Sequence, residues 1–249
     1  MILERYLKVA NIYNKTLDDE NLIDSINNTL ENDIEVEITS KLDTNQLNKV
    51  SFYYNFANYS ILAGCVYVIC LILSSFKNRN INSRTVVSSI NYKEYNIKLL
   101  LSNSLFALIL WAIYVILSFI LLVNIIFTTH CLFYVINSFI FTFCAVTIAF
   151  LIGNLVNNKN AINGIVNVVA LGSSFLCGSF VPVELLPSSV LRIAHFLPSY
   201  YINSNEILKQ IEVFNYSSIK PILINMITII SFSILFIIIT NIITKKKRG

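Results

Sequence analysis

The longest uncharged stretch of this chain is the feature that most constrains its fold. From Leu99 to Asn158, 60 consecutive residues contain no Lys, Arg, Asp or Glu. About 20 apolar residues span the hydrocarbon core of a bilayer, so this stretch has room for two membrane helices joined by a short turn near residues 124–130. Charged residues make up 13% of the chain, whereas soluble domains carry roughly 25%. The sequence therefore predicts a polytopic membrane protein.

Further apolar stretches without charged residues are long enough to span a membrane at residues 56–76, 161–181 and 222–244. Together with the two spans between residues 99 and 158, they predict an all-α membrane protein with about five transmembrane helices. We expect three parts, namely an external N-terminal segment (1–55), a transmembrane domain (56–244) and a basic cytoplasmic tail (245–249).

The net charge of +4 hides an uneven distribution of charge along the chain. Residues 1–56 carry a net charge of −5 and residues 183–220 are neutral, whereas the loop 77–98, Lys159 and residues 245–248 carry +4, +1 and +4. With five spans, the three basic segments lie on one side of the membrane, and excess Lys and Arg mark the cytoplasmic side. We therefore predict a multi-pass protein of the plasma membrane with its N-terminus outside and its C-terminus in the cytoplasm.

The start of the chain conflicts with this orientation. An N-terminal segment of 56 residues must cross the membrane, yet its first residues, MILERYLKVANIYNK, lack the basic, apolar and small-residue order of a signal peptide. We expect the chain to be the C-terminal portion of a six-span protein, without the first span, or to be encoded in a truncated form. Thr16–Asp19 resembles a capping box, and Ile34, Val36 and Ile38 alternate as in a strand. These patterns predict the remnant of a small external α/β ectodomain.

The predicted spans lack the residues that membrane catalysis or ion coupling usually requires. No Lys, Arg, Asp or Glu lies within them, and no His, Asp or Glu pair has metal-ligand spacing. Asn and Ser side chains leave sodium coupling open. Gly153–Lys159 lacks the second glycine and the Ser or Thr after the lysine that a phosphate-binding loop needs. We predict no catalytic residue, metal site or cofactor in this chain, and the distribution of charge argues against a nucleic-acid partner.

The fourth predicted span carries a stripe of polar residues. Asn160, Asn163, Asn167 and Ser174 recur at helical spacing. Such side chains in membrane helices bond to neighbouring helices or line a polar path. The sequence leaves open whether the stripe serves helix packing, a transport path or the seam of a dimer.

Between the fourth and the last span the chain reads GSFVPVELLPSSVLRIAHFLPSYY, residues 178–201. Pro182, Pro187 and Pro198 interrupt any continuous helix here, because proline lacks the N–H that a helix interior requires. Between the last two prolines, apolar residues recur at helical spacing. The pattern predicts a short amphipathic or re-entrant helix at the outer membrane interface.

This region resembles the segment before the last span in ABC-2 type exporter permeases. The family pattern is Gly-x-Phe-x-Pro-x-Glu-x-Leu-Pro, followed by a short external helix that ends near Leu-Pro-x-Tyr. The matching residues are Gly178, Phe180, Pro182, Glu184, Leu186, Pro187, Leu197, Pro198 and Tyr200. The resemblance extends over residues 52–244.

The loop 77–98 resembles the first cytoplasmic loop of the same family, where a basic stretch precedes a Ser-Pro-x-Ser-like turn and a helix. Arg79 and Arg84 match the basic stretch, Ser88 and Ser89 match the turn with Ser89 in place of the family's proline, and Lys93 follows. The resemblance implies that this loop docks on a separate ABC ATP-binding subunit, which holds ATP and Mg²⁺. It also implies a second permease half, most simply in a homodimer. From the residues alone, orientation and attraction to lipid headgroups explain these bases equally well.

Two functions remain open from the sequence. The first is the permease subunit of an ATP-driven exporter, for efflux of a lipid, peptide or drug-like substrate that suits an uncharged interior. The second is a non-transporting membrane protein, such as an assembly factor, an immunity factor or a degenerate permease fragment. An intramembrane hydrolase is disfavoured because the spans lack paired catalytic residues. A bound ATPase would distinguish the first function from the second.

Overall fold

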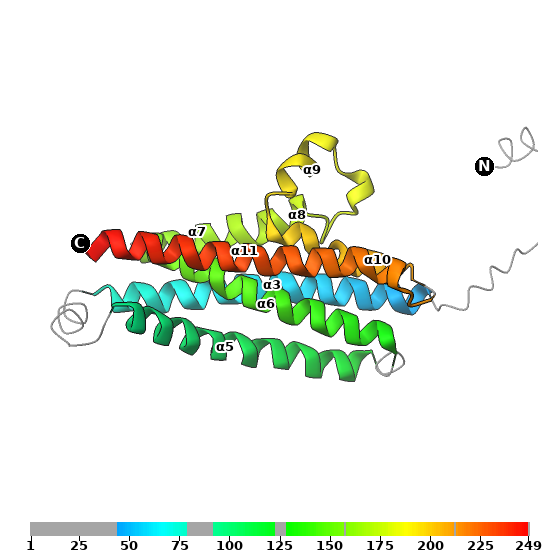
Figure 1. The fold of residues 1–249 in the computed structure, drawn as a ribbon, viewed down its shortest axis with the longest axis horizontal. Helices are drawn as coiled ribbons and strands as arrows, with labels where there is room; N and C mark the ends of the chain where they lie inside the picture. Colours follow the sequence, from blue (N-terminus) through cyan, green and yellow to red (C-terminus); the bar gives the residue numbers. More distant parts are fainter. Residues whose placement is uncertain (1–43, 79–91, 123–127, 157, 212, 249) are drawn as a thin grey trace, which may run out of the picture. The chain divides into compact units, whose positions relative to one another are not determined.

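The computed structural model describes residues 44–78, 92–122, 128–156, 158–211 and 213–248, and the secondary structure in this part of the chain is entirely helical. Four helices in it are long and apolar enough to cross a membrane (Figure 1). They are α3 (Thr44–Phe76), α5 (Tyr92–Leu121), α6 (Thr129–Leu155) and α11 (Tyr216–Arg248). The prediction of an all-α polytopic membrane protein is therefore confirmed. The predicted helix and strand of the N-terminal segment lie outside the described residues.

The first long helix begins earlier than the first predicted span. It starts at Thr44, twelve residues before Phe56. The added turns are polar overall, but Leu47, Val50 and Tyr54 lie on one face at spacings of three and four and are buried. Packing of this narrow apolar face extends the helix beyond the stretch that hydropathy alone marks as a span.

Helix α6 lies at the centre of the bundle, because it packs against each of the other three long helices. Helix α5, by contrast, presents large apolar side chains to the outside, including Leu105, Ile109, Ile116 and Ile120. An apolar outer surface of this kind suits contact with lipid tails, since the helix satisfies its own backbone hydrogen bonds. The polar residues of the bundle are accordingly found mainly between helices.

The fourth predicted span is a run of short helices, which differs from the expected single long helix. Its helical part, from Ile162 to Leu176, consists of α7 (Ile162–Val166), the π-helical segment η2 (Asn167–Gly172) and α8 (Ser173–Leu176). Fifteen residues rise about 22 Å, less than the ~30 Å hydrocarbon core. The chain continues through η3 (Val183–Leu185), α9 (Ser188–Ala194), η4 (Pro198–Asn203) and α10 (Ser204–Leu208).

This run of short helices still carries the chain from one end of the bundle to the other. Ile162 packs in a core cluster with Leu73 and Phe150, near the C-terminal ends of α3 and α6. Leu208 packs in a second cluster with Leu47 and other residues from the N-terminal ends of the same two helices. The described part of the chain thus passes along the bundle four times as a long helix and once as short helices (Figure 1).

The described ends of all three basic segments lie at the same end of the bundle. Lys77, which follows α3, bonds to the carbonyls at the end of α6. Asn96 in the second turn of α5 donates to Thr244 near the end of α11, with 3.2 Å between Nδ2 and Oγ1. The described ends of the loop 77–98, the short helix η1 (Lys159–Ala161) and residues 245–248 all adjoin this end. We call it the basic end.

Candidate functional site

The glycine of the resemblance motif ends the fourth membrane segment. Gly178 has a φ of +86°, a conformation that side chains rarely adopt. The N–H of Ser179 bonds to the carbonyl of Ser174 at 3.1 Å, which is the six-to-one bond of a Schellman cap. A Cβ at Gly178 would lie 2.5 Å from a methyl carbon of Val183. The motif therefore requires glycine at this position for both its backbone angle and its space.

The phenylalanine of the motif joins this cap to the first helix. The ring of Phe180 lies 5.1 Å from that of Tyr59 and 6.3 Å from that of Phe56, both on α3, and 5.3 Å from that of Phe175. Aromatic pairs at these separations are favourable beyond the area they bury. The aromatic cluster fixes the start of the segment between α8 and α10 against α3.

The prolines mark the boundaries of the short helices that follow. Pro182 and Pro187 directly precede η3 and α9, and Pro198 is the first residue of η4. The predicted helix between the last two prolines is α9, with Ala194 buried while Ile193 is 60% exposed. Of the remaining motif residues, Glu184 lies within η3, and the ring of Tyr200 in η4 lies 4.1 Å from that of His195.

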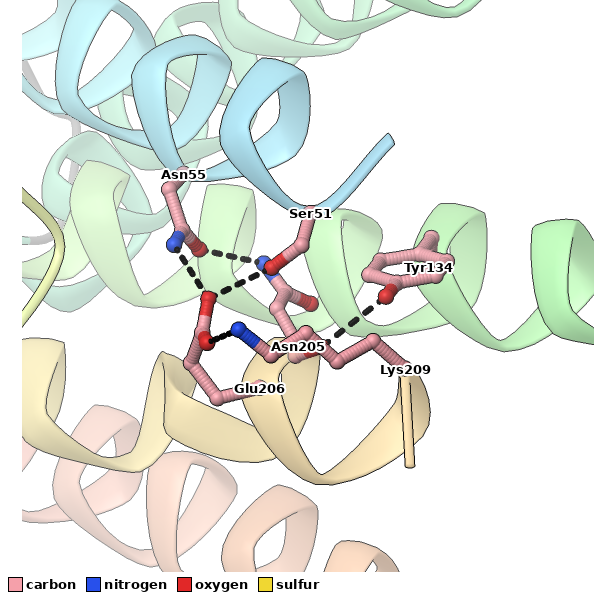
Figure 2. A network of polar contacts seen from close by, with 6 residues as sticks. All are labelled: Ser51, Asn55, Tyr134, Asn205, Glu206 and Lys209. Carbon is pink, nitrogen blue, oxygen red and sulfur yellow. Dashed lines mark hydrogen bonds and ion pairs between the residues drawn. The ribbon is translucent and has the colours of Figure 1, made fainter. Parts of the chain in front are cut away.

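A carboxylate of α10 lies against α3 (Figure 2). It lies at the end of the bundle opposite the basic end, where Leu208 of the same helix packs with Leu47 near the start of α3. Glu206 of α10 accepts a hydrogen bond from the hydroxyl of Ser51 at 2.7 Å and a longer one from the amide of Asn55 at 3.5 Å. Its other oxygen pairs with the ammonium group of Lys209 one turn away. Glu206 and Lys209 remain about one-third exposed, so the ion pair is formed at the edge of the bundle.

Asn205 connects three elements within the same network (Figure 2). Its amide nitrogen donates to the side-chain oxygen of Asn55 on α3 at 2.8 Å, and its side-chain oxygen accepts from Asn137 on α6 at 2.9 Å. Its backbone carbonyl accepts a bond from the hydroxyl of Tyr134 at 2.9 Å. Asn205 is completely buried. Both polar groups of its side chain thus form hydrogen bonds, one that attaches α10 to α3 and one that attaches it to α6.

Sequence reasoning did not identify this network. The charge-free spans gave no reason to place a carboxylate against them, and Glu206 belonged to a connecting segment. A signal was present in Ser51, Asn55 and Asn58, which recur at spacings of four and three just before the most apolar part of α3. All three are buried. Within the described residues no group of three His, Cys, Asp or Glu side chains is placed to hold a metal ion.

The polar stripe of the fourth segment divides into two parts. Asn163 and Asn167 are exposed and lie beside Val168, which is 74% exposed. Ser174 is buried. The division follows from η2, because a π-helical turn contains more residues than an α-helical turn and shifts the face on which later residues lie. The two asparagines therefore do not pack against the other described helices, whereas Ser174 lies in the interior of the bundle.

Most of the residues predicted to contact an ATPase lie outside the part of the chain that the structure describes. Arg79, Arg84, Ser88 and Ser89 lie outside the described residues, and Lys93 is the second residue of α5. The described residues fix the two roots of this loop, at Lys77 and at Tyr92.

Comparison with protein families identifies the chain. The family model described as ABC-2 family transporter protein matches residues 1–243. Comparisons with curated proteins and with solved structures gave no match. Membership of this family implies an ABC ATP-binding subunit as a partner. The chain, with its bundle of apolar helices, therefore belongs to the ABC-2 family of transporter proteins, as a multi-pass permease subunit of an ABC transporter.

Proposed function

We propose that this chain is the membrane half of an ATP-driven exporter, in which a separate subunit hydrolyses ATP. The exposed polar face formed by Asn163 and Asn167 is the observation that carries the proposal. Lipid tails provide no hydrogen-bond partner for an amide, so an outward-facing Asn pair is costly in a bilayer. Such a face is stabilised when it meets another subunit or water along a path. A second copy of the chain, facing the first across this surface, is such a subunit, and the space between the two copies is such a path.

The basic end is the cytoplasmic end in this proposal. The loop 77–98 and the tail 245–248 each carry +4, and the described parts of both adjoin the same end of the bundle. Excess Lys and Arg within short loops mark the cytoplasmic side. The orientation places the loop in the compartment that holds ATP, with Arg79, Arg84 and the 85–95 segment as the docking surface for the ATPase. ATP and Mg²⁺ then bind to that partner and not to this chain.

The exposed face of the fourth segment also bears on the substrate class. Next to the two asparagines it carries exposed apolar side chains, those of Val168, Leu171 and Phe175. A path lined by both kinds of group suits an amphipathic molecule, such as a lipid, a peptide or a drug-like compound, better than a small ion. Alternating exposure of this face to the two sides of the membrane, driven by the ATPase, would then export the substrate.

The dimer face is tested by cysteine cross-linking in native membranes. All five native cysteines are free and buried, so an introduced surface cysteine is the main reactive thiol. Val168→Cys is expected to give a disulfide-linked dimer on mild oxidation. The matched control, Ile120→Cys, has a similar exposure of 68% but lies on the lipid-facing side of α5. Equal cross-linking of the two variants, or none for Val168→Cys, contradicts the proposed face.

The partner is tested by purifying the tagged, full-length chain from its own membranes in mild detergent. We expect an ATPase with a phosphate-binding loop to co-purify, and Arg79→Ala with Arg84→Ala to reduce its recovery. Purification without any ATPase would favour a non-transporting membrane protein. Undiminished recovery with the double variant would instead reject only the docking assignment.

A further inference from the structure

We propose that Lys77 is a positioning residue that joins the root of the loop 77–98 to the end of α6, so that a movement of this loop also moves α6 and the polar segment after it. The inference rests on the proposed function, in which this loop receives the force of ATP hydrolysis. It adds a route by which that force reaches the exposed asparagine face.

The ammonium group of Lys77 is surrounded by backbone carbonyls of another element. Its Nζ donates to the carbonyl oxygens of Gly153 at 2.8 Å, Asn154 at 3.0 Å and Val156 at 2.6 Å. An ammonium group has three protons to donate, which is enough for all three bonds. Lys77 is the first residue after α3. Its side chain thus reaches from the start of the loop to the last turn of α6.

Lys77 contacts carbonyls at the C-terminal end of α6, two from its last turn and one from its C-cap residue, Val156. The last four carbonyls of an α-helix have no partner within the helix. In α6 the N–H of Val156 bonds to the carbonyl of Ile152 at 2.9 Å, which leaves the following carbonyls for Lys77. The C-terminal end of a helix also carries a partial negative charge that attracts a cation. The position therefore binds a lysine by both hydrogen bonding and charge.

The two helices also approach each other closely at this point. A Cβ at Gly153 would lie 2.5 Å from a methyl carbon of Leu73 and 3.4 Å from the Cα of Cys70. One turn earlier, the thiol of Cys70 lies 3.8 Å from the carbonyl of Ala149. The ends of α3 and α6 therefore touch along their backbones, and Lys77 holds them together at the end of this contact.

The route continues from α6 into the fourth segment. Helix α6 ends at Leu155, and η1 begins at Lys159, so three residues separate them. Asn163 lies in the helix that follows directly. Such a short connection leaves little slack, and a displacement of the end of α6 is passed on to the polar face. The other root of the loop is held differently, through the bond between Asn96 and Thr244.

The experiment compares three variants reconstituted in liposomes with the co-purified ATPase. Lys77→Met has a side chain of similar length without charge, and Lys77→Arg restores charge and donors. The matched control is Lys98→Met, which removes the same charge from the second turn of α5, the helix that follows the loop. Lys98 is 65% exposed and pairs with Glu94 on its own helix. ATPase recovery, ATP hydrolysis and export of a fluorescent amphipathic probe are measured together.

We expect Lys77→Met to retain ATPase recovery within twofold while export per ATP hydrolysed falls at least tenfold. Lys77→Arg is expected to recover at least half of the wild-type ratio, and Lys98→Met to match the wild type. An unchanged ratio in Lys77→Met, or failure of Lys77→Arg to restore it, overturns the inference. Loss of ATPase recovery in Lys77→Met also overturns it, because Lys77 would then be a docking residue.

A second measurement separates this inference from the proposed function. Spin labels are attached through Ser75→Cys and Leu155→Cys, both at exposed positions on the two helix ends. In the detergent-purified chain, Lys77→Met is expected to broaden the distance distribution between the labels at least twofold, and Lys77→Arg to leave it narrow. The result needs no ATPase. A narrow distance distribution in Lys77→Met refutes the inference that Lys77 holds the ends of α3 and α6 together. Absence of an ATPase refutes only the proposed function.

Discussion

Replacement of Asn205 by alanine is the most direct test of how the bundle holds α10. The substitution removes two hydrogen bonds and leaves the side-chain oxygen of Asn55 and the amide of Asn137 without their partner. Asn137 is fully buried and Asn55 is 5% exposed, so water does not readily replace the lost bonds. The bond from Tyr134 to the backbone carbonyl of residue 205 is retained.

The size of the effect follows from these two lost partners. Leaving a buried polar group unsatisfied costs about 1–3 kcal/mol in soluble proteins, but hydrogen bonds between membrane helices average about 0.6 kcal/mol with a maximum near 1.7 kcal/mol. Because both partners are buried, we expect the upper part of the membrane range for each. The free energy of unfolding is then reduced by about 3 kcal/mol, which lowers Tm by about 6–12 °C for a chain of this size.

The buried cysteines provide the assay. A dye that fluoresces on reaction with thiols reports unfolding in detergent, since all five cysteines are buried in the folded chain. Asn48→Ala serves as the control, because Asn48 lies on the same helix as Asn55 but is exposed. A shift in Tm of less than about 2 °C, corresponding to under about 1 kcal/mol, would show that the network does not hold α10.

Further predictions concern the cap, the ion pair and the aromatic cluster. Gly178→Ala is expected to lower the stability by about 1–3 kcal/mol through strain at a positive φ, measured with the same dye; wild-type stability would show that the cap tolerates a side chain. Glu206→Gln removes the ion pair with Lys209 but keeps an acceptor for Ser51, so a loss under about 1 kcal/mol is expected for this partly exposed pair. A larger loss would mean that the charge itself holds α10. Phe180→Leu is expected to cost about 0.5–1.5 kcal/mol by removing ring contacts, and an unchanged Tm would contradict the tethering of this segment to α3.

The sequence was sufficient to predict that these long helices exist, because a charge-free apolar stretch is a local feature, although α3, α5 and α11 extend beyond the predicted spans. Charge-free stretches correctly indicated α5, α6 and α11. The start of α3 at Thr44 was missed because residues 44–55 are polar in composition. Their helical structure depends on Leu47 and Tyr54 packing against residues more than 70 positions away in the chain, which no local pattern contains.

The candidate site was less predictable, for two physical reasons. The stripe of the fourth segment was drawn at 3.6 residues per turn, and the π-helical η2 breaks that period between Asn163 and Ser174. The network around Asn205 joins residues about 70 and 150 positions apart. No single asparagine of the network stands out in the sequence of an Asn-rich chain, because these residues come together only in the folded structure. Gly178 was singled out only through the resemblance to a family pattern, and its positive φ became visible in the structure.

The collection of basic segments at one end of the bundle also restricts how two copies can assemble. In the proposed orientation, the loop 77–98, Lys159 and residues 245–248 place nine net positive charges on the electrically negative side of the membrane. Each charge carried across a potential of 100 mV changes the free energy by about 2.3 kcal/mol, so inverting a copy costs about 20 kcal/mol from this source alone. If the proposed orientation holds, all copies have the same orientation in the membrane. Two of them that meet across the Asn163 face form a parallel pair, related by a twofold axis perpendicular to the membrane plane.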